Sequence, residues 1–318
     1  MYLGIDIGGT RLKAGLVGED GRVLRSAHTA SPASRQALES TLPALVQQVL
    51  ADEAAPRAVG FGCKGIIDAG TTEVRTLPGV WGFLVGLRLS DTVRGLVDES
   101  TPIAADNDAK AALAGEVAWG AARGRSNVVL LTLGTGIGGA ILADGRILRG
   151  ATDVAGHLGH MCAEPDGPLC ICGNRGCLET IFSSRAIEAE AWAAAHLGCA
   201  SPMTEILRSH PEALSCQFVF EQAALGDPIA QRLLEKKIRV LGACIAGLLH
   251  TLDPEVVILS GSIAEAGAAL FEPLQKEVDG RVLGLLKRQV PLVPTGVNDT
   301  SGIVGACGLA RLAAGGVG

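Results

Sequence analysis

Short apolar runs separated by glycine turns recur at two places along the chain. The first place, Leu3 to Leu24, predicts three strands joined by turns at Gly8-Gly9 and at Glu19-Asp20-Gly21-Arg22. An Asp-Gly pair between apolar runs is typical of a β-hairpin. Because the order of elements repeats as well as the composition, we favour a duplicated lobe over the chance similarity of two glycine-rich hairpins. The second copy comprises Val128 to Leu133, Gly134-Thr135-Gly136, Ile137 to Ala143, Asp144-Gly145-Arg146 and Ile147-Leu148.

The segments around these copies read as helices and short buried strands. Helices are predicted near 34–52, from Asn107 to about Trp119, over 184–196 and 228–251, and from Gly302 to Ala313. Strands are predicted near 57–62, 102–105 and 256–259. This alternation of strands and helices predicts an α/β protein with mainly buried sheets.

Composition narrows the classes of protein that fit. Of the 318 residues, 48% are apolar and only 3% are aromatic, so the core must consist of Ala, Val, Ile and Leu. The net charge of −6 argues against a nucleic-acid groove or a polybasic membrane surface. The chain shows neither a signal peptide nor an apolar run of about 18 residues. We therefore expect a cytoplasmic protein with reduced cysteines that interacts with neither nucleic acid nor membrane.

The two Gly/Thr turns are candidate phosphate sites. In Asp6-Ile7-Gly8-Gly9-Thr10 the glycines allow close approach of a ligand, and their N–H groups can face phosphate oxygens. The Thr10 hydroxyl can donate, Arg11 or Lys13 can neutralise charge, and Asp6 can hold Mg²⁺ through water. The alternative for this segment is a plain tight hairpin. Gly134-Thr135-Gly136 forms a second such turn, which suggests phosphates held between two lobes.

A cluster of cysteines predicts a metal site. His160, Cys170, Cys172 and Cys177 follow the spacing His-x9-Cys-x-Cys-x4-Cys among turn-forming glycines and a proline. Three thiolates and one imidazole suit tetrahedral Zn²⁺, and four protein ligands leave no open position, so the zinc is expected to be structural. Free buried thiols are the alternative. Cys162 is close in sequence, but its register is less suitable.

Three polar residues stand between the strand 102–105 and the helix that follows. One of Asp106, Asn107 and Asp108 is expected to cap the helix, but three exceed what a cap needs. The carboxyl end of a strand is where α/β proteins bind ligands. We therefore predict that Asp108 accepts a proton from a substrate hydroxyl and that Asn107 orients the substrate.

With these residues in view, the chain closely resembles the ROK family of sugar kinases and repressors over essentially its whole length. The resemblance implies the two-lobed actin/hexokinase-like (ribonuclease H-like) α/β fold, duplicated, with ATP and a sugar in the cleft between the lobes. It also implies a homodimer. The matching segments are Asp6 to Thr10, Asn107-Asp108-Ala109, Leu133 to Gly139, His157-Leu158-Gly159-His160, Cys170 to Glu179 and Val256 to Gly261.

The resemblance implies lobe boundaries and residue roles. The N-terminal lobe would span 1–106, completed by a C-terminal helix over 302–318, and the larger lobe, with the zinc loop and nucleotide contacts, would span 107–301. Asp108 matches the catalytic base, and His160, Cys170, Cys172 and Cys177 match the zinc ligands. The positions that match sugar-binding residues are Gly65, Thr76, Asn107, Asp108, His157, His160 and Glu179. Those that match the side of ATP and Mg²⁺ are Asp6, Gly8, Gly9, Thr10, Arg11, Gly134, Thr135, Gly136 and Gly261.

Departures from the family pattern fall on the sugar side. His157 stands where family glucokinases commonly have Glu, as in bacterial N-acetylmannosamine kinases, and Thr76 stands where glucokinases often have Asn. Ser260-Gly261-Ser262 replaces a run of glycines. The expected reaction is phosphorylation of a hexose at O6, with glucose as the first choice of substrate and N-acetylmannosamine as the alternative. We reject a repressor because the first strand begins at residue 2 and the charge is −6. A non-catalytic sugar sensor is less favoured because the catalytic set is intact.

Overall fold

The structure, a computed structural model, describes residues 1–51, 53–77, 79–282, 284, 288–297 and 301–315. It divides into two compact units. The first consists of Met1–Ser126, Ala140–Gly156 and Thr295–Gly318, and the second of Asn127–Gly139 and His157–Pro294. The division expected from the sequence, at residue 106, differs from this one. The helix after residue 107 groups with the first unit because it packs on the C-terminal helix, whose predicted residues 316–318 lie outside the described part.

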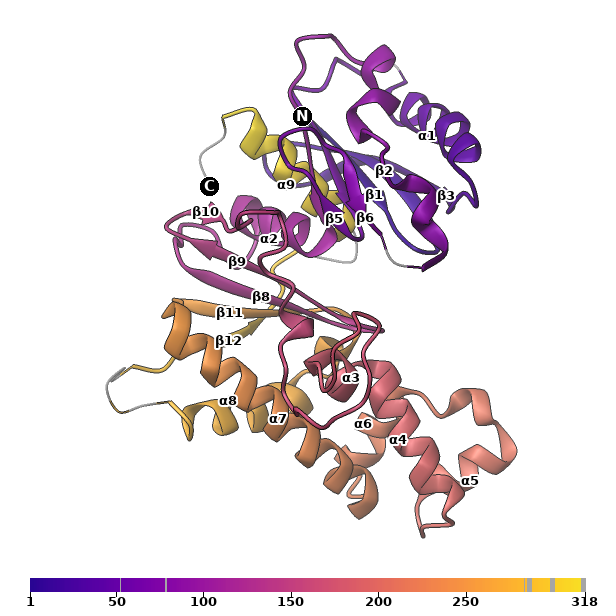
Figure 1. Ribbon diagram of the computed structural model, residues 1–318, viewed down its shortest axis with the longest axis vertical. Helices are drawn as coiled ribbons and strands as arrows, with labels where there is room; N and C mark the ends of the chain where they lie inside the picture. Colours follow the sequence, from indigo (N-terminus) through magenta and orange to yellow (C-terminus); the bar gives the residue numbers. More distant parts are fainter. Residues whose placement is uncertain (52, 78, 283, 285–287, 298–300, 316–318) are drawn as a thin grey trace. The chain divides into compact units, whose positions relative to one another are not determined.

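The first sheet has five strands in the order β3-β2-β1-β4-β7. Figure 1 labels its strands β1, β2 and β3. β1 is antiparallel to β2 and parallel to β4, and β4 is parallel to β7. A separate antiparallel pair, β5 and β6, follows β4 in the chain. The strands are β1 (Tyr2–Ile7), β2 (Arg11–Val17), β3 (Val23–Ala30), β4 (Val59–Cys63), β5 (Ile66–Ile67), β6 (Val74–Thr76) and β7 (Ile103–Asn107).

The second sheet repeats this topology in the order β10-β9-β8-β11-β12. β8 is parallel to β11 and β11 to β12, as β1 is to β4 and β4 to β7. The duplication predicted from the two glycine-turn segments is therefore confirmed by sheet order. The strands are β8 (Val128–Leu133), β9 (Ile137–Ala143), β10 (Arg146–Ile147), β11 (Val256–Ser260) and β12 (Leu292–Pro294).

The helices that were predicted lie within about two residues of their predicted positions, and the structure adds several that were not. Asn107 caps α2 through its side chain, and Pro228 occupies the first turn of α7. The α-helices are α1 (Arg35–Leu50), α2 (Asp108–Trp119), α3 (Leu178–Phe182), α4 (Ser184–His196), α5 (Pro202–Ser209), α6 (Cys216–Ala224), α7 (Pro228–Leu252), α8 (Ala268–Asp279) and α9 (Ser301–Ala313). Short 3-10 helices are η1 (Gly79–Leu84), η2 (Leu89–Thr92), η3 (Arg94–Leu96), η4 (Leu158–His160), η5 (Pro211–Ala213) and η6 (Ser262–Ala266). Among the described helices, none combines the length and the apolar character needed to cross a membrane.

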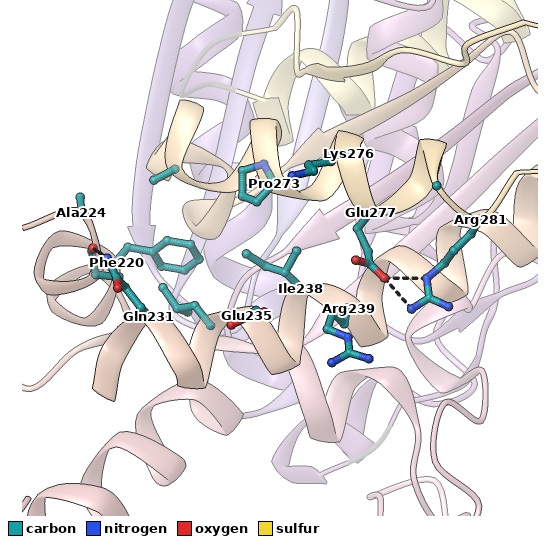
Figure 2. A pocket seen from close by; sticks show the side chains of 14 residues that line it. Phe220, Ala224, Gln231, Glu235, Ile238, Arg239, Pro273, Lys276, Glu277 and Arg281 are labelled. Carbon is teal, nitrogen blue, oxygen red and sulfur yellow. Dashed lines mark hydrogen bonds and ion pairs between the residues drawn. The ribbon is translucent and has the colours of Figure 1, made fainter. Parts of the chain in front are cut away.

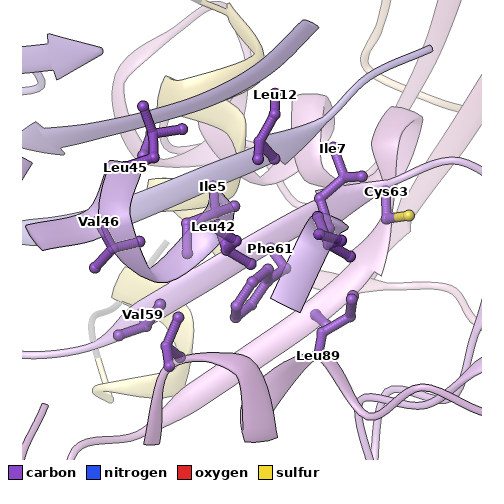
Figure 3. Close-up of a cluster of buried hydrophobic side chains, with 14 of the residues drawn as sticks. Ile5, Ile7, Leu12, Leu42, Leu45, Val46, Val59, Phe61, Cys63 and Leu89 are labelled. Carbon is purple, nitrogen blue, oxygen red and sulfur yellow. The ribbon is translucent and has the colours of Figure 1, made fainter. Parts of the chain in front are cut away.

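The two faces of the first sheet pack differently. On one face, Leu3, Ile5 and Ile7 of β1 join the apolar side of α1 in an aliphatic core around Phe61 (Figure 3). On the other face, α9 lies so close to the strands that a Cβ atom on Gly60 would overlap the carbonyl oxygen of Ala306. The side-chain alternation of a strand explains this difference, because successive residues point to opposite faces.

Candidate active site and metal cluster

Two predicted site residues, Gly8 and Asp108, stand in a row with Lys64 at the carboxyl ends of three parallel strands in the first unit. In the sheet register, Cys63 of β4 pairs with Ile7 of β1 on one side and with Asn107 of β7 on the other. The residues that follow these strand ends, Gly8, Lys64 and Asp108, therefore stand in adjacent positions. Such an edge is where ligands bind in open α/β sheets.

The Asp108 carboxyl group combines solvent access with a desolvating environment. Its side chain is exposed to solvent, yet nearby protein atoms partly desolvate the carboxyl group. This desolvation raises the pKa of Asp108 to about 6, with Asp6 also raising it and the Lys64 ammonium opposing the shift. The group is thus mostly ionised at neutral pH and remains basic enough to accept a proton.

The Asn107 side chain forms hydrogen bonds that stabilise the start of α2 and the segment at Gly65. Its buried side chain accepts the Ala109 N–H at 3.0 Å, which caps α2, and its amide donates to the Gly65 carbonyl at 3.0 Å. Gly65 has φ +89°, and a Cβ atom there would overlap the carbonyl oxygen of Thr76. Gly65, Thr76 and Asn107, all predicted on the sugar side, are therefore neighbours. Pro78, in the same segment as Thr76, lies outside the described residues.

Asp106 has a supporting role that the sequence did not indicate. It is fully buried, accepts the Asn107 N–H at 2.8 Å and pairs with Arg149 at 2.8 Å and with Lys110 at 3.7 Å. Lys110 is itself buried and donates to the carbonyl of Asp153 at 2.5 Å. Two cations and a backbone N–H thus compensate the Asp106 charge beneath the turn that carries Asp108.

The Gly8-Gly9-Thr10 turn is braced by the protein while its tip stays exposed. The Gly8 N–H donates to the Arg11 carbonyl at 3.1 Å, and the Ser31 hydroxyl donates to the Gly8 carbonyl at 2.6 Å. Gly9, Thr10 and Arg11 are exposed. Close by, Asp6 forms an ion pair with Lys13 at 3.2 Å. The exposed tip of the turn is therefore open to a ligand; its role in binding phosphate stays a prediction.

The corresponding turn of the second unit lies beside Gly261. β8 and β11 pair with Thr132 opposite Ser260, so Gly134 and Gly261 follow adjacent strand ends. Gly261 has φ +89°, and a Cβ atom there would overlap the carbonyl oxygen of Leu133. A residue larger than glycine at position 261 would therefore push this segment away from the Gly134 turn. Thr135, at the tip of its turn, is exposed.

Glu179 connects the second turn to the cysteine segment. It belongs to α3, which begins directly after Cys177, and its carboxylate accepts the Ile137 N–H at 2.9 Å. A Cβ atom on Gly136 would crowd that carboxylate. One carboxylate oxygen is thus engaged by the backbone, and the half-buried side chain keeps acceptor capacity for another partner.

The two histidines of the predicted sugar side lie together. His157 and His160 stack with ring centroids 6.4 Å apart and an interplanar angle of 13°. The 3-10 helix η4 between them approaches β9 so closely that a Cβ atom on Gly159 would overlap the Ile137 carbonyl oxygen. The phosphate turn, Glu179 and the histidine pair are therefore all built around Ile137 in the second unit.

The four predicted zinc ligands converge. The ligand atoms of His160, Cys170, Cys172 and Cys177 all lie within 4.8 Å of one another. Cys170 Sγ is 3.5 Å from His160 Nδ1, and Cys172 Sγ is 3.6 Å from Cys177 Sγ. A tetrahedral Zn²⁺ with bonds of about 2.3 Å to sulfur and about 2.0 Å to nitrogen separates neighbouring ligand atoms by about 3.5–3.8 Å. The donor set and the spacing thus fit zinc.

The loop around this cluster depends on close backbone approach. The Ala163 and Glu164 N–H groups both donate to the Gly176 carbonyl, and a Cβ atom on Gly176 would overlap the Glu164 carbonyl oxygen. Cys162 pairs with Cys177 across an isolated β-bridge, but its Sγ points to the Arg175 carbonyl at 3.6 Å. Cys162 is therefore not part of the cluster, in agreement with its less suitable register.

A cavity of 530 Å³ adjoins the Gly261 turn. It is lined by Ser262, Ile263 and Glu265 after the turn and by residues of α4 and α6. A larger cavity of 860 Å³ lies between α6, α7 and α8, with Phe220, Ile238 and Pro273 along its wall (Figure 2). Neither cavity is lined by predicted site residues, but the smaller one begins at Ser262, next to Gly261.

Comparisons with known proteins identify the family to which the chain belongs. The chain matches the ROK family over residues 2–313. It is 33% identical to a glucokinase from Thermotoga maritima, over 99% of this chain and 98% of that protein. It is 35% identical to an N-acetylmannosamine kinase from Escherichia fergusonii, over 85% of this chain and 86% of that protein. A ROK family glucokinase from Streptomyces griseus, in complex with glucose and AMPPNP, has 31% identity and a TM-score of 0.81, with 98% of this chain and 99% of that chain covered.

The fold and these relatives define the class of the protein: it is a sugar kinase with the two-lobed actin/hexokinase-like fold. The chain belongs to the ROK family.

Proposed function

We propose that this protein phosphorylates a hexose at O6 with ATP and that Asp108 is the general base. The observation that carries the proposal is the Asp108 carboxylate, which stands at the carboxyl end of β7 with a pKa raised to about 6. Asp6 and Lys64 act electrostatically on the same carboxylate, and the Gly8 turn lies two strands away, with β4 and Lys64 between them. A base of this kind accepts the hydroxyl proton as the sugar oxygen attacks.

In the proposed reaction, the sugar O6 forms a bond to the γ-phosphorus while the bond from that phosphorus to the β-γ bridging oxygen breaks. The proton of the hydroxyl passes to Asp108, and ADP leaves with the bonding electrons. Most of the rate enhancement in such transfers comes from positioning and charge neutralisation. The exposed tips of the Gly8 and Gly134 turns supply N–H groups suited to phosphate oxygens.

We also assign sites for the adenosine and for Mg²⁺, from the polar groups that each site offers. The 530 Å³ cavity beside Gly261 suits the adenosine, because Ser262 and Glu265 place polar groups at its wall. Mg²⁺ is assigned to the Asp6 side, with Asp6 contacting its water shell, and when bound it would neutralise phosphate charge. Asp6 already shares its charge with Lys13, which favours this water-mediated role over direct ligation.

The cysteine cluster is assigned to a structural zinc ion. Four protein ligands complete the coordination shell, so zinc would act on the loop and not on the reaction. His160 is a ligand and stacks on His157, and α3 with Glu179 begins at the ligand Cys177. When bound, zinc would therefore fix three residues assigned to the sugar.

Two sugars are candidate substrates. Glucose is the first choice, supported by the glucokinases among the relatives. N-Acetylmannosamine is the second, favoured by His157, whose imidazole can donate to an acyl carbonyl.

A coupled assay for ADP release with glucose, mannose, fructose, allose and N-acetylated hexosamines distinguishes these substrates by kcat/KM. His157→Glu should raise the preference for glucose over N-acetylmannosamine if the histidine selects the acyl group, and an unchanged ratio removes that role from His157.

Replacing the base tests the central assignment. Asp108→Asn should lower kcat by about 10²-fold or more because the amide cannot accept the hydroxyl proton. Sugar binding, measured by calorimetry, should change much less than kcat. Turnover close to that of the original protein would refute the role of Asp108.

Removing one thiolate tests the metal assignment. Cys172→Ser should reduce zinc content, measured by atomic absorption, and should raise the KM for the sugar more than the KM for ATP, because the loop carries sugar-side residues. Cys162→Ser is the matched control, since this cysteine lies outside the cluster. Equal zinc content in the two variants would contradict the ligand set.

A further inference from the structure

Lys64 occupies the middle of the row at the strand ends, although nothing in the sequence motifs singles it out. It follows Cys63, which pairs with Ile7 and with Asn107. Neighbouring strands lie about 4.8 Å apart. The backbone of Lys64 is therefore one strand from the Gly8 turn on one side and one strand from Asp108 on the other.

The Lys64 side chain leans over the phosphate turn. Its Nζ lies 3.4 Å from the position that a Cβ atom would take on Gly9, so the ammonium stands against the glycine itself. The side chain is exposed, and within the described ranges no carboxylate comes within 4.0 Å of Nζ. By contrast, Lys13 of β2 is paired with Asp6 at 3.2 Å. Among the described residues, the Lys64 ammonium thus forms no ion pair and is available to a phosphate group.

We infer that Lys64 is a further catalytic residue, whose ammonium contacts the oxygens of the phosphoryl group as it passes from ATP to the sugar. This inference rests on the proposed function. Lys64 remains protonated throughout: the hydroxyl proton goes to Asp108, and the lysine contributes hydrogen bonds and positive charge only. The position fits because the phosphoryl group must travel between the groups held by the Gly8 turn and the hydroxyl facing Asp108.

The charge of Lys64 serves the reaction in two ways. In phosphoryl transfer, negative charge is spread over the equatorial oxygens, and a preorganised cation stabilises it. The same cation lowers the pKa of Asp108, which desolvation raises, and so keeps the base ionised at neutral pH. A single lysine between turn and base therefore links charge neutralisation to the protonation state of the base.

The test replaces Lys64 by Met, which keeps most of the unbranched side chain and removes its charge. Lys64→Met should lower kcat by about 10²-fold, comparable with the loss of one preorganised donor in other enzymes. The acidic limb of the kcat/KM profile should move to higher pH, because the ammonium no longer lowers the pKa of Asp108. Lys64→Arg should restore part of kcat and return the limb toward its original position.

Two controls separate this role from a structural one. Lys236→Met removes an exposed lysine on α7, outside the predicted site, and should change neither kcat nor the pH profile. The melting temperature of Lys64→Met should match that of the original protein, since the side chain is exposed. A variant that keeps full kcat overturns the inference, and so does one that loses kcat together with thermal stability while its acidic limb stays in place.

Asp108→Asn, measured in parallel, distinguishes the two assignments. If Asp108→Asn is inactive and Lys64→Met is fully active, Lys64 has no catalytic role and the proposed base stands. If Asp108→Asn keeps its turnover, the proposed base itself is wrong, and the inference built on it is overturned as well.

Discussion

Three consecutive polar residues at the end of β7 show how neighbours in sequence acquire different roles. Asp106 points into the protein and is compensated by Lys110 and Arg149. Asn107 caps α2 and holds Gly65. Asp108 alone faces solvent, under partial desolvation. The sequence predicted the cap and selected Asp108, but it could not show that Asp106 is buried, because Arg149 is distant along the chain.

The pKa of Asp108 predicts a pH dependence. A general base must be ionised, so kcat/KM should fall as the pH drops through about 6, the value to which desolvation raises the pKa of Asp108. An unperturbed aspartate would place this limb near pH 4. A pH profile of kcat/KM from 4.5 to 8.5 measures it, with protein stability checked at each pH. Full activity at pH 4.5 would contradict the raised pKa.

At the scale of elements, glycines allow α9 to approach the first sheet closely. Gly4 of β1 and Gly60 of β4 face α9, and α9 contributes its own small residues at Gly305 and Gly308, where it meets α2. The sequence predicted a helix from Gly302 to Ala313, which is α9. Which strands it would cover was not predictable, because that contact joins the two ends of the first unit.

This close packing predicts a large difference between two Gly→Ala substitutions. Gly60→Ala should lower the free energy of unfolding by about 1–3 kcal/mol, because the new methyl group overlaps the Ala306 carbonyl. Gly247→Ala, in the exposed face of α7 with open space around it, should raise the free energy of unfolding by about 0.5–1 kcal/mol. Urea titration measures both. A neutral Gly60→Ala would mean that α9 packs less closely than described.

At the scale of the whole molecule, the chain folds into two units whose segments are interleaved along the sequence. The chain passes from one unit to the other after residues 126, 139, 156 and 294. β9 begins in the second unit and ends in the first. Neither unit is therefore a continuous segment that could be excised with its core complete. The homodimer implied by the family resemblance stays a prediction.

Interleaving predicts cooperative unfolding. Differential scanning calorimetry should show one transition with equal calorimetric and van't Hoff enthalpies. The reason is that each unit is assembled from segments that are separated along the chain by segments of the other unit. Independent domains would instead give two transitions. Two resolved peaks, only one of them shifted by the sugar, would contradict this prediction.

By itself, the sequence determined the α/β class, the duplication, the two Gly/Thr turns, the metal-ligand spacing and the position of Asp108 at a strand end, because each of these depends on residues close together in the chain. Only the tertiary structure decided which residues stand next to these motifs. The register of β4 between β1 and β7 brings Lys64 beside Asp108, and the fold brings Arg149 to Asp106 and Glu179 to Ile137. The local sequence pattern is enough to predict helices, strands and turns. Strand pairing and packing join segments that are distant in the chain, and only they decide which charged groups surround Asp108.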